Sequence, residues 1–561
     1  MRKIILVILS LFVGCFGLEI DKGSKLYQQH CATCHGVDRT GTVAPPLLPI
    51  FLKKFSEKKL IYIIKNGIPA TQMPPFQNLS EEDIKSIISY IKTPVKINWS
   101  EDRITKSIQI KNLPSKNLGI KDIKNVVAVV ERGKQKVWIM EGTKVLDKFD
   151  FKNVHGGLKF SPEFSFKTYN SSGWKIYIPS RDGWIGRYDL DKGRFYGKVR
   201  ACVYLRNISL DRKGKYILAS CWLPKSIVIL DANNFKPVRF IKQKNLISAI
   251  YELYSNDKAV FTYRDKAVIG FLNIKDFSIE YKKINEPYED FFIDPFEEYI
   301  VGTSRKGTRL NVYDIKKNKE IFSYSIEGMP HLASATFWYK NGKFFFGTHH
   351  IGKPYITIWQ MYKWGFVKKV NIKGNGFFVR THPTTPYLWT DNGKDKIVIV
   401  DKNDFSVKTV PTIKGKRVIH TEFSGDGNLA YVSLYNRDGA ILIYDSITLK
   451  LLKKLPASIP IGKYNIVNKS RRYSPILLGR EVFLTKCWGC HHQTQEAFAP
   501  SFRWIVNHRK KSLIISHIMN PEATYKQLGY KRNAMPRLNL SKEELKAILS
   551  YMMEFKDVKD K

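Results

Sequence analysis

The middle of the chain repeats one short apolar phrase. Eight runs follow one another, and most of them end in an acidic residue: "VWIME", "IGRYD", "IVILD", "FLNIK", "LNVYD", "ITIWQ", "IVIVD" and "ILIYD", with last residues Glu141, Asp189, Asp231, Lys275, Asp314, Gln360, Asp401 and Asp445. The gaps between these ends are 48, 42, 44, 39, 46, 41 and 44 residues. Strand-rich repeats with such a period are typical of propeller blades. The pattern predicts an eight-bladed all-β propeller over residues 118–468, in which a turn joins each phrase to a second apolar strand.

Both ends of the chain have a helical pattern instead. Ser80 precedes acidic residues and isoleucines at helical spacing in "NLSEEDIKSIISYIK", which predicts an N-capped amphipathic helix. Ser541 opens a similar segment, "NLSKEELKAILSYMMEF". We therefore expect two small all-α domains, at residues 18–100 and 472–561, flanking the propeller. Linkers are expected at 94–115 and 456–478.

Each helical end contains the unit C-x-x-C-H, which attaches c-type haem. Cys31 and Cys34 precede His35, and Cys487 and Cys490 precede His491. Two thiols at this spacing reach the two vinyl groups of one porphyrin, and the next side chain reaches the iron. A redox C-x-x-C pair would leave both histidines without a role.

A methionine completes each haem set. Met73 and Met535 both precede a proline, well downstream of the attachment histidine. Such a loop methionine suits the distal iron ligand, and Met/His ligation raises the haem potential. We expect two covalent c haems, and residues 18–100 resemble a class I cytochrome c over their whole length.

The N-terminus, "MRKIILVILSLFVGCFGLEI", predicts export. A basic start, a short apolar run and small residues are typical of a secretory signal peptide, here residues 1–17. Lipid anchoring through Cys15 is the alternative, because "LFVGC" is close to a lipoprotein cleavage box. We expect a periplasmic protein, and in such a protein Cys202 and Cys221 could form a disulfide or stay as buried thiols.

The net charge of +43 allows a nucleic-acid partner, but export argues against one. The lysines are also spread along the chain instead of forming one tract. A solvated basic surface, or one that steers an acidic redox partner or a small anion, is the better interpretation. The expected partners are soluble or membrane-bound electron carriers.

Phrases along the propeller resemble the cytochrome cd1 family, in which an N-terminal cytochrome c is joined to an eight-bladed propeller that holds haem d1. The matching phrases are "KNVHGGLKFSP", "SRDGWIGRYDL", "VYLRNISL" and "SCWLPKS". The resemblance implies that His155 is the proximal ligand of the haem d1 iron and that Arg181 and Arg206 lie near its carboxylates. It places Trp222 on an aromatic-proline turn of the cofactor site. The resemblance covers residues 20–468, so the C-terminal cytochrome domain is an addition.

Two departures from the nitrite reductases of that family bear on catalysis. Those enzymes have two distal histidines; His331 matches the second, but Glu289 stands where the first would be. An ionised glutamate would repel an anion such as nitrite unless burial raised its pKa. His420 lies in "HTEF", which is similar to a phrase of the haem d1 maturation proteins. The resemblance thus implies catalytic roles for Glu289, His331 and His420.

Three functions stay open for an exported multihaem oxidoreductase. The favoured one is oxidation of a dihydro precursor of haem d1, a tetrapyrrole, with electrons passing to the c haems. The second is reduction of a small anion, nitrite, to nitric oxide. In the third, the propeller holds no cofactor and the chain only relays electrons. The oligomeric state is open.

Overall fold

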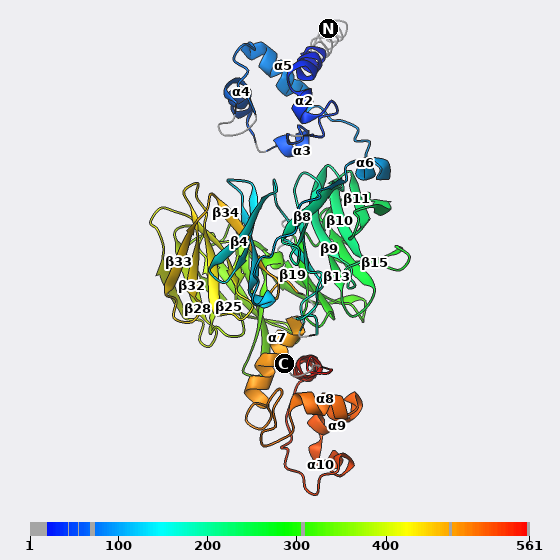
Figure 1. Ribbon diagram of the computed structural model, residues 1–561, viewed down its shortest axis with the longest axis vertical. Helices are drawn as coiled ribbons and strands as arrows, with labels where there is room; N and C mark the ends of the chain where they lie inside the picture. The colour runs from blue at the N-terminus through cyan, green and yellow to red at the C-terminus, as the bar shows by residue number, and fades with distance from the viewer. Residues whose placement is uncertain are drawn as a thin grey trace.

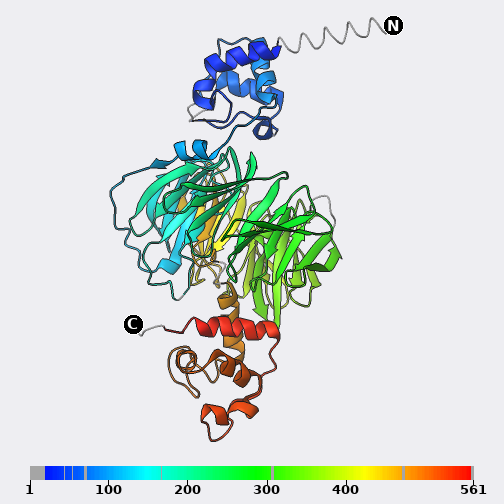
Figure 2. The same cartoon turned by 90° about the vertical axis from the view of Figure 1, so that its right-hand side faces the viewer.

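The computed structural model describes residues 19–42, 44–53, 55–67, 73–165, 167–304, 309–470 and 474–557. A β-propeller lies in the middle, and a small helical domain lies on each of two opposite sides of it (Figures 1 and 2). This confirms the predicted fold class. The predicted signal peptide and Cys15 lie outside the described residues. Within the described part of the chain, no helix is long and apolar enough to cross a membrane.

The propeller has eight antiparallel sheets, and the strands of each blade are given from the centre outward. The first four blades are β34 (Pro460–Asn465), β2 (Val126–Glu131), β3 (Lys136–Glu141) and β4 (Lys144–Asp150); β5 (Lys159–Ser161), β6 (Lys175–Pro179), β7 (Trp184–Asp189), β8 (Arg194–Arg200) and β1 (Gln109–Ile110); β9 (Tyr204–Leu210), β10 (Tyr216–Leu223), β11 (Lys225–Asp231) and β12 (Pro237–Lys242); β13 (Ile247–Leu253), β14 (Lys258–Tyr263), β15 (Val268–Asn273) and β16 (Ile279–Lys283).

The other four blades are β17 (Asp290–Ile293), β18 (Tyr299–Thr303), β19 (Arg309–Asp314) and β20 (Lys319–Ser325); β21 (Met329–Pro330) and β22 (Thr336–Lys340), both paired with β23 (Lys343–Ile351), then β24 (Tyr355–Gln360) and β25 (Gly365–Asn371); β26 (Val379–Arg380), β27 (Tyr387–Asp391), β28 (Lys396–Asp401) and β29 (Val407–Pro411); β30 (Val418–Phe423), β31 (Leu429–Leu434), β32 (Ala440–Asp445) and β33 (Leu451–Pro456).

The repeated phrase is the third strand of every blade. These strands, such as β11 and β28, are buried along most of their length. A strand follows each phrase, as predicted, but the prediction that it is apolar is wrong, because in seven of the eight blades this strand is the outer edge; in the other blade β1 pairs outside β8. In β12 and β29, for example, at least half of the residues are exposed, and polar residues stand between apolar ones.

The propeller is closed by pairing the two ends of its chain. β34 joins β2, with Val127 opposite Asn465 and Val129 opposite Lys463. The expected linker 456–478 therefore contains the closing strand and the start of a helix. The other expected linker, 94–115, contains the helix α6 (Glu101–Lys106) and β1, which pairs with β8. Cys202 and Cys221 form a disulfide, with their Cα atoms 6.2 Å apart.

The N-terminal domain consists of short helices around an isoleucine-rich core. Residues 19–30 are helical, and α2 (Ala32–His35), α3 (Pro49–Leu52), α4 (Glu57–Asn66) and α5 (Glu81–Lys92) follow. Ser80 caps α5 and exchanges hydrogen bonds with Asp83, which confirms the predicted N-cap. The predicted stripe of α5 is buried.

The C-terminal domain repeats this plan. Its elements are α7 (Ser474–Lys486), α8 (Phe502–His508), α9 (Lys511–Met519), α10 (Pro521–Thr524), the 3-10 turn η3 (Lys526–Leu528) and α11 (Lys542–Met553). Two further 3-10 turns lie in the propeller, η1 (Ile123–Asn125) and η2 (Leu332–Ser334). Ser541 is the N-cap of α11, as predicted, and forms a capping box with Glu544.

The two helical domains bind opposite faces of the propeller (Figure 2). On the upper face of Figure 1, Arg200 donates hydrogen bonds to the carbonyls of Thr40 and Gly41, and Phe51 packs on Tyr204 with ring centroids 4.7 Å apart. On the lower face, the Tyr339 backbone N–H donates to Glu481 over 2.8 Å. Upper and lower keep this meaning below.

Candidate functional site

The haem-attachment residues of the N-terminal domain lie on one helical turn. Cys31 is the N-cap of α2, and His35 is its last residue. Nδ1 of His35 lies 2.7 Å from the carbonyl oxygen of Pro45, so it acts as the donor and Nε2 keeps its lone pair. Burial lowers the pKa of His35, which favours the neutral, metal-binding imidazole. Cys31 and Cys34 are not bonded to each other.

The C-terminal domain reproduces this arrangement. Nδ1 of His491 lies 2.8 Å from the carbonyl oxygen of Pro500, and burial again lowers the histidine pKa. Cys487 and Cys490 are free thiols in the structure. Both attachment sites thus have two unbonded thiols and an oriented neutral imidazole, which fits a covalent c haem.

The two methionines occupy comparable loops. The Met73 carbonyl lies against Gly67, where a Cβ would come within 2.7 Å of it, and Gly67 has φ +67°. Met535 is partly buried against the core of the C-terminal domain. Residues 68–72, just before Met73, lie outside the described residues. Both methionines stay predicted distal ligands.

Arginines and aromatic rings lie together at the upper end of the propeller channel, and we call this group the arginine cluster. It consists of Arg132, Arg181, Arg206 and Arg264 with Tyr204 and Trp222. The Arg181 guanidinium lies 5.1 Å over the Tyr204 ring, and that of Arg264 lies 5.0 Å over Trp222. Burial and the other three arginines lower the pKa of Arg181 to about 10. So many neighbouring cations favour a ligand with several carboxylates.

His155 lies in this cluster. Its Nε2 contacts the Arg181 guanidinium, while its Nδ1 is buried with no hydrogen-bond partner in the described structure. Burial and the charges of Arg181, Arg206 and Arg132 hold the pKa of His155 well below its usual range. A neutral buried imidazole beside carboxylate-binding arginines fits the axial ligand of an iron tetrapyrrole. Gly156 makes the turn possible, because it has φ +98° and a Cβ there would lie 2.9 Å from the Arg206 carbonyl.

Glu289 and His331 lie at the same end of the channel but differ in their surroundings. Glu289 forms an ion pair with Arg264 at 2.8 Å, and its side chain is only 9% exposed. Nδ1 of His331 lies 2.9 Å from the Phe377 carbonyl. Asp290, which the sequence did not single out, accepts a hydrogen bond from the Ala333 N–H in the turn after His331. Burial raises the pKa of Asp290 and the neighbouring His331 opposes that shift.

His420 is the most unusual residue of the channel. Its ring packs 4.6 Å from that of Phe378 and 5.8 Å from that of Tyr464. Nδ1 is buried without a hydrogen-bond partner among the described residues. Burial and then the charges of Lys463, Arg380 and Lys469 hold its pKa well below the usual range.

The structure adds two arginines that the sequence did not single out. Arg132, Arg181 and Arg264 each follow the second strand of their blade, namely β2, β6 and β14. Aligning the eight repeats by the first residues of their third strands would have brought these three residues to within one position of one another, 4, 3 and 4 residues before β3, β7 and β15. Glu422 was noted in the sequence beside His420, and in the structure it is buried and accepts from Asn468 over 3.1 Å.

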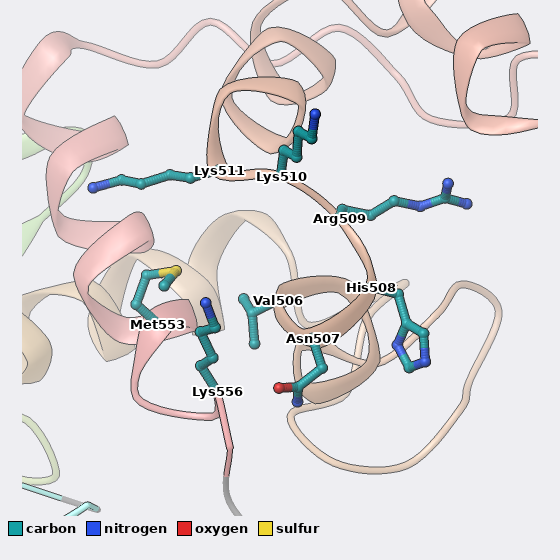
Figure 3. Close-up of a pocket in the computed structure, with 8 residues that line it drawn as sticks. All are labelled: Val506, Asn507, His508, Arg509, Lys510, Lys511, Met553 and Lys556. Carbon is teal, nitrogen blue, oxygen red and sulfur yellow. The ribbon is translucent and has the colours of Figure 1, made fainter.

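A separate depression of about 300 Å³ lies on the C-terminal domain (Figure 3). It is lined by residues between α8 and α9 and at the end of α11. Figure 3 shows His508, Arg509 and Lys510 pointing away from its centre, so these side chains do not converge on a ligand. We assign it no role.

Known proteins match all three parts of the chain. Residues 121–469 match the family described as cytochrome D1 heme domain. Residues 18–91 match cbb3-type cytochrome c oxidase subunit III, and residues 476–556 match cytochrome c.

The chain is 32% identical over 471 residues to a dihydro-heme d1 dehydrogenase of Pseudomonas aeruginosa, covering 80% of this chain and 94% of that relative. It is 22% identical over 540 residues to a nitrite reductase of Stutzerimonas stutzeri, covering 80% and 93%. A solved structure of the dihydro-heme d1 dehydrogenase NirN in complex with DHE superposes with a TM-score of 0.74 at 31% identity, over 80% of this chain and 99% of that one. The chain therefore belongs to the cytochrome d1 haem domain family, and it carries a cytochrome c domain at each end.

Proposed function

We propose that this protein is a periplasmic dehydrogenase that oxidises a dihydro form of haem d1 and passes the electrons to its own two c haems. The observation that carries the proposal is His420, a buried, neutral imidazole held in a left-handed backbone conformation at the centre of the propeller. The similarity to a dihydro-heme d1 dehydrogenase over 94% of that relative supports it.

The substrate binds in the upper part of the channel. The arginine cluster pairs with the carboxylates of the macrocycle, and His155 supplies an axial imidazole to its iron. Glu289 is already paired with Arg264, so we assign it to balancing the arginine charge instead of to proton transfer. This differs from the catalytic role that its alignment implies.

His420 removes protons from the dihydro macrocycle. The dihydro form has two more hydrogens than the product, so a carbon–carbon double bond replaces two C–H bonds, and two protons and two electrons leave. A neutral imidazole can accept a proton, and the low pKa keeps it neutral at physiological pH. When bound, each c haem supplies a one-electron acceptor.

Nitrite reduction is the second candidate, and His331 favours it. This histidine matches one of the two distal histidines of the nitrite reductases, and its ring lies close to Asp290 and the channel. Glu289 repels nitrite less than an ionised glutamate without a partner would, because Arg264 neutralises its carboxylate. A propeller without cofactor is disfavoured, since Glu289 balances the charge of Arg264 alone among four clustered arginines that repel one another.

The two chemistries are separated by supplying each substrate to the holoprotein. Under anaerobic conditions, the oxidised protein should convert dihydro-haem d1 to haem d1 while its own c haems become reduced. The reduced protein should release nitric oxide from nitrite only slowly. Rapid, sustained nitric oxide release that is lost in His331→Ala and kept in His420→Ala would overturn the proposal.

A further inference from the structure

A second group of ionisable side chains lies below His420 in the propeller channel. Lys469, five residues after Tyr464, has its ammonium 5.2 Å from the centre of the Tyr464 ring, and that ring packs on His420. Lys469 faces Arg380 from β26, Glu422 from β30 and Lys159 from β5. Arg380, Glu422 and Lys159 lie in the first strands of three blades, and Lys469 lies in the turn after β34, the first strand of a fourth blade.

The group continues towards the lower face. Lys159 lies 3.6 Å from Glu252 of β13, whose side chain is 2% exposed. Glu163 hydrogen-bonds the hydroxyl of Ser470, the residue next to Lys469, and also interacts with Tyr254, Glu252 and Lys159. The Ser474 hydroxyl at the start of α7 donates to the Ser470 carbonyl over 3.5 Å, so this end of the group lies where the C-terminal domain begins.

The protons that the reaction releases at His420 need a path to solvent through the lower part of the channel. Two C–H bonds break, the two electrons reduce two ferric c haems, and both protons stay behind on the protein. The upper end of the channel is lined by the arginine cluster and lies beside the N-terminal domain, and cations there oppose the passage of a proton. His420 must lose its first proton before it can accept a second.

We propose that Lys469, Glu252 and Glu163 carry the protons from His420 down the channel to the lower face of the propeller. This inference rests on the proposed dehydrogenase function. The pKa values suit the role: burial and the neighbouring Arg380 lower that of Lys469 to about 7, while burial and the neighbouring Glu252 raise that of Glu163 to about 7. Lys469 and Glu163 can therefore each gain and lose a proton near neutral pH.

The test compares Glu163→Gln and Lys469→Met with a matched control, Glu481→Gln. Burial also raises the pKa of Glu481 to about 7, but this residue lies at the contact between the propeller and the C-terminal domain. In a single turnover with dihydro-haem d1, haem absorbance reports electron transfer and a pH dye reports proton release. Both relay variants should slow the two signals by roughly 10- to 100-fold, with a larger solvent deuterium isotope effect and unchanged macrocycle affinity.

Infrared spectroscopy gives a readout that does not depend on turnover. The wild type should show protonated carboxyl bands that decline as the pH rises through about 7; the Glu163 band should be missing in Glu163→Gln, and the Glu481 band should be missing in Glu481→Gln instead. Wild-type rates in both relay variants, or equal slowing in Glu481→Gln, would overturn the relay. A wild type that binds but never oxidises the macrocycle would overturn the proposed function itself, and the relay with it.

Discussion

Replacing His420 by asparagine tests the proposed base without disturbing the backbone that holds it. The native φ of +54° is in the left-handed region, where asparagine is several-fold enriched among residues other than glycine. Alanine would lose the imidazole and keep the strain, so its effect would mix catalysis with stability. Asparagine also fills part of the space between the Phe378 and Tyr464 rings.

The expected loss is a ~10²- to 10⁴-fold slower oxidation of dihydro-haem d1, the usual contribution of one general acid or base. This corresponds to about 3–5 kcal/mol in the activation free energy. Tyr464 cannot replace the histidine, because burial raises its pKa to about 12 and leaves it protonated. Binding of the macrocycle should change little, since its carboxylates and iron are assigned to the arginine cluster and His155.

The assay is a stopped-flow single turnover with a separate binding titration. His350→Gln is the matched control, because His350 is also buried but uses both ring nitrogens inside its own blade, bonding Glu327 and Thr357. The His350→Gln variant should have a lower free energy of unfolding, and its folded fraction should oxidise dihydro-haem d1 at the wild-type rate. Because the pKa of His420 is well below its usual range, a titration of the wild-type rate near pH 7 should come from Lys469 and Glu163 and not from His420. A wild-type rate of dihydro-haem d1 oxidation in His420→Asn would refute the assignment of His420 as the base.

Three further predictions follow from the same structure. Cys487→Ala with Cys490→Ala should remove one of two covalent haems in a pyridine haemochrome assay, and a wild-type count of one would contradict the motif assignment. His155→Ala should abolish tight binding of the d-type macrocycle and keep both c haems, as visible spectra would report; unchanged d1 content would exclude this ligand. Replacing Cys202 and Cys221 by alanine should lower the free energy of unfolding by about 3 kcal/mol, because their bridge closes a loop between residues 19 apart; an unchanged denaturation midpoint would show that the bridge adds nothing.

The blades were predictable from the sequence because one strand of each is buried on both sides. The third strand has neighbours in its own sheet and in the adjacent blades, so its apolar run is nearly continuous and recurs once per blade. The outer strands face solvent and their sequences vary, which is why the expectation of a second apolar strand was wrong. β34 has no such signal, because its partner β2 lies at the far end of the propeller sequence.

The two kinds of site differed in how far the sequence could predict them. Each c-haem site has its two thiols and proximal histidine within five residues, so the local motif contains that geometry. The propeller site is assembled from the loops of several blades, and its contacts depend on their arrangement around the channel. The pairing of Glu289 with Arg264 is an example, because these residues lie 25 positions apart and belong to neighbouring blades.

The position of the C-terminal domain limits the role of its haem. The arginine cluster adjoins the N-terminal domain through Tyr204 and Phe51, whereas the C-terminal domain contacts Tyr339 on the lower face. β23 runs from beside Tyr339 to the segment paired with β21, and its nine residues span roughly 30 Å. We therefore expect the N-terminal haem to be the first acceptor for electrons from the macrocycle. The C-terminal haem is placed to exchange electrons at the other face, so the variant without it should keep the first oxidation step and lose the capacity for a second electron.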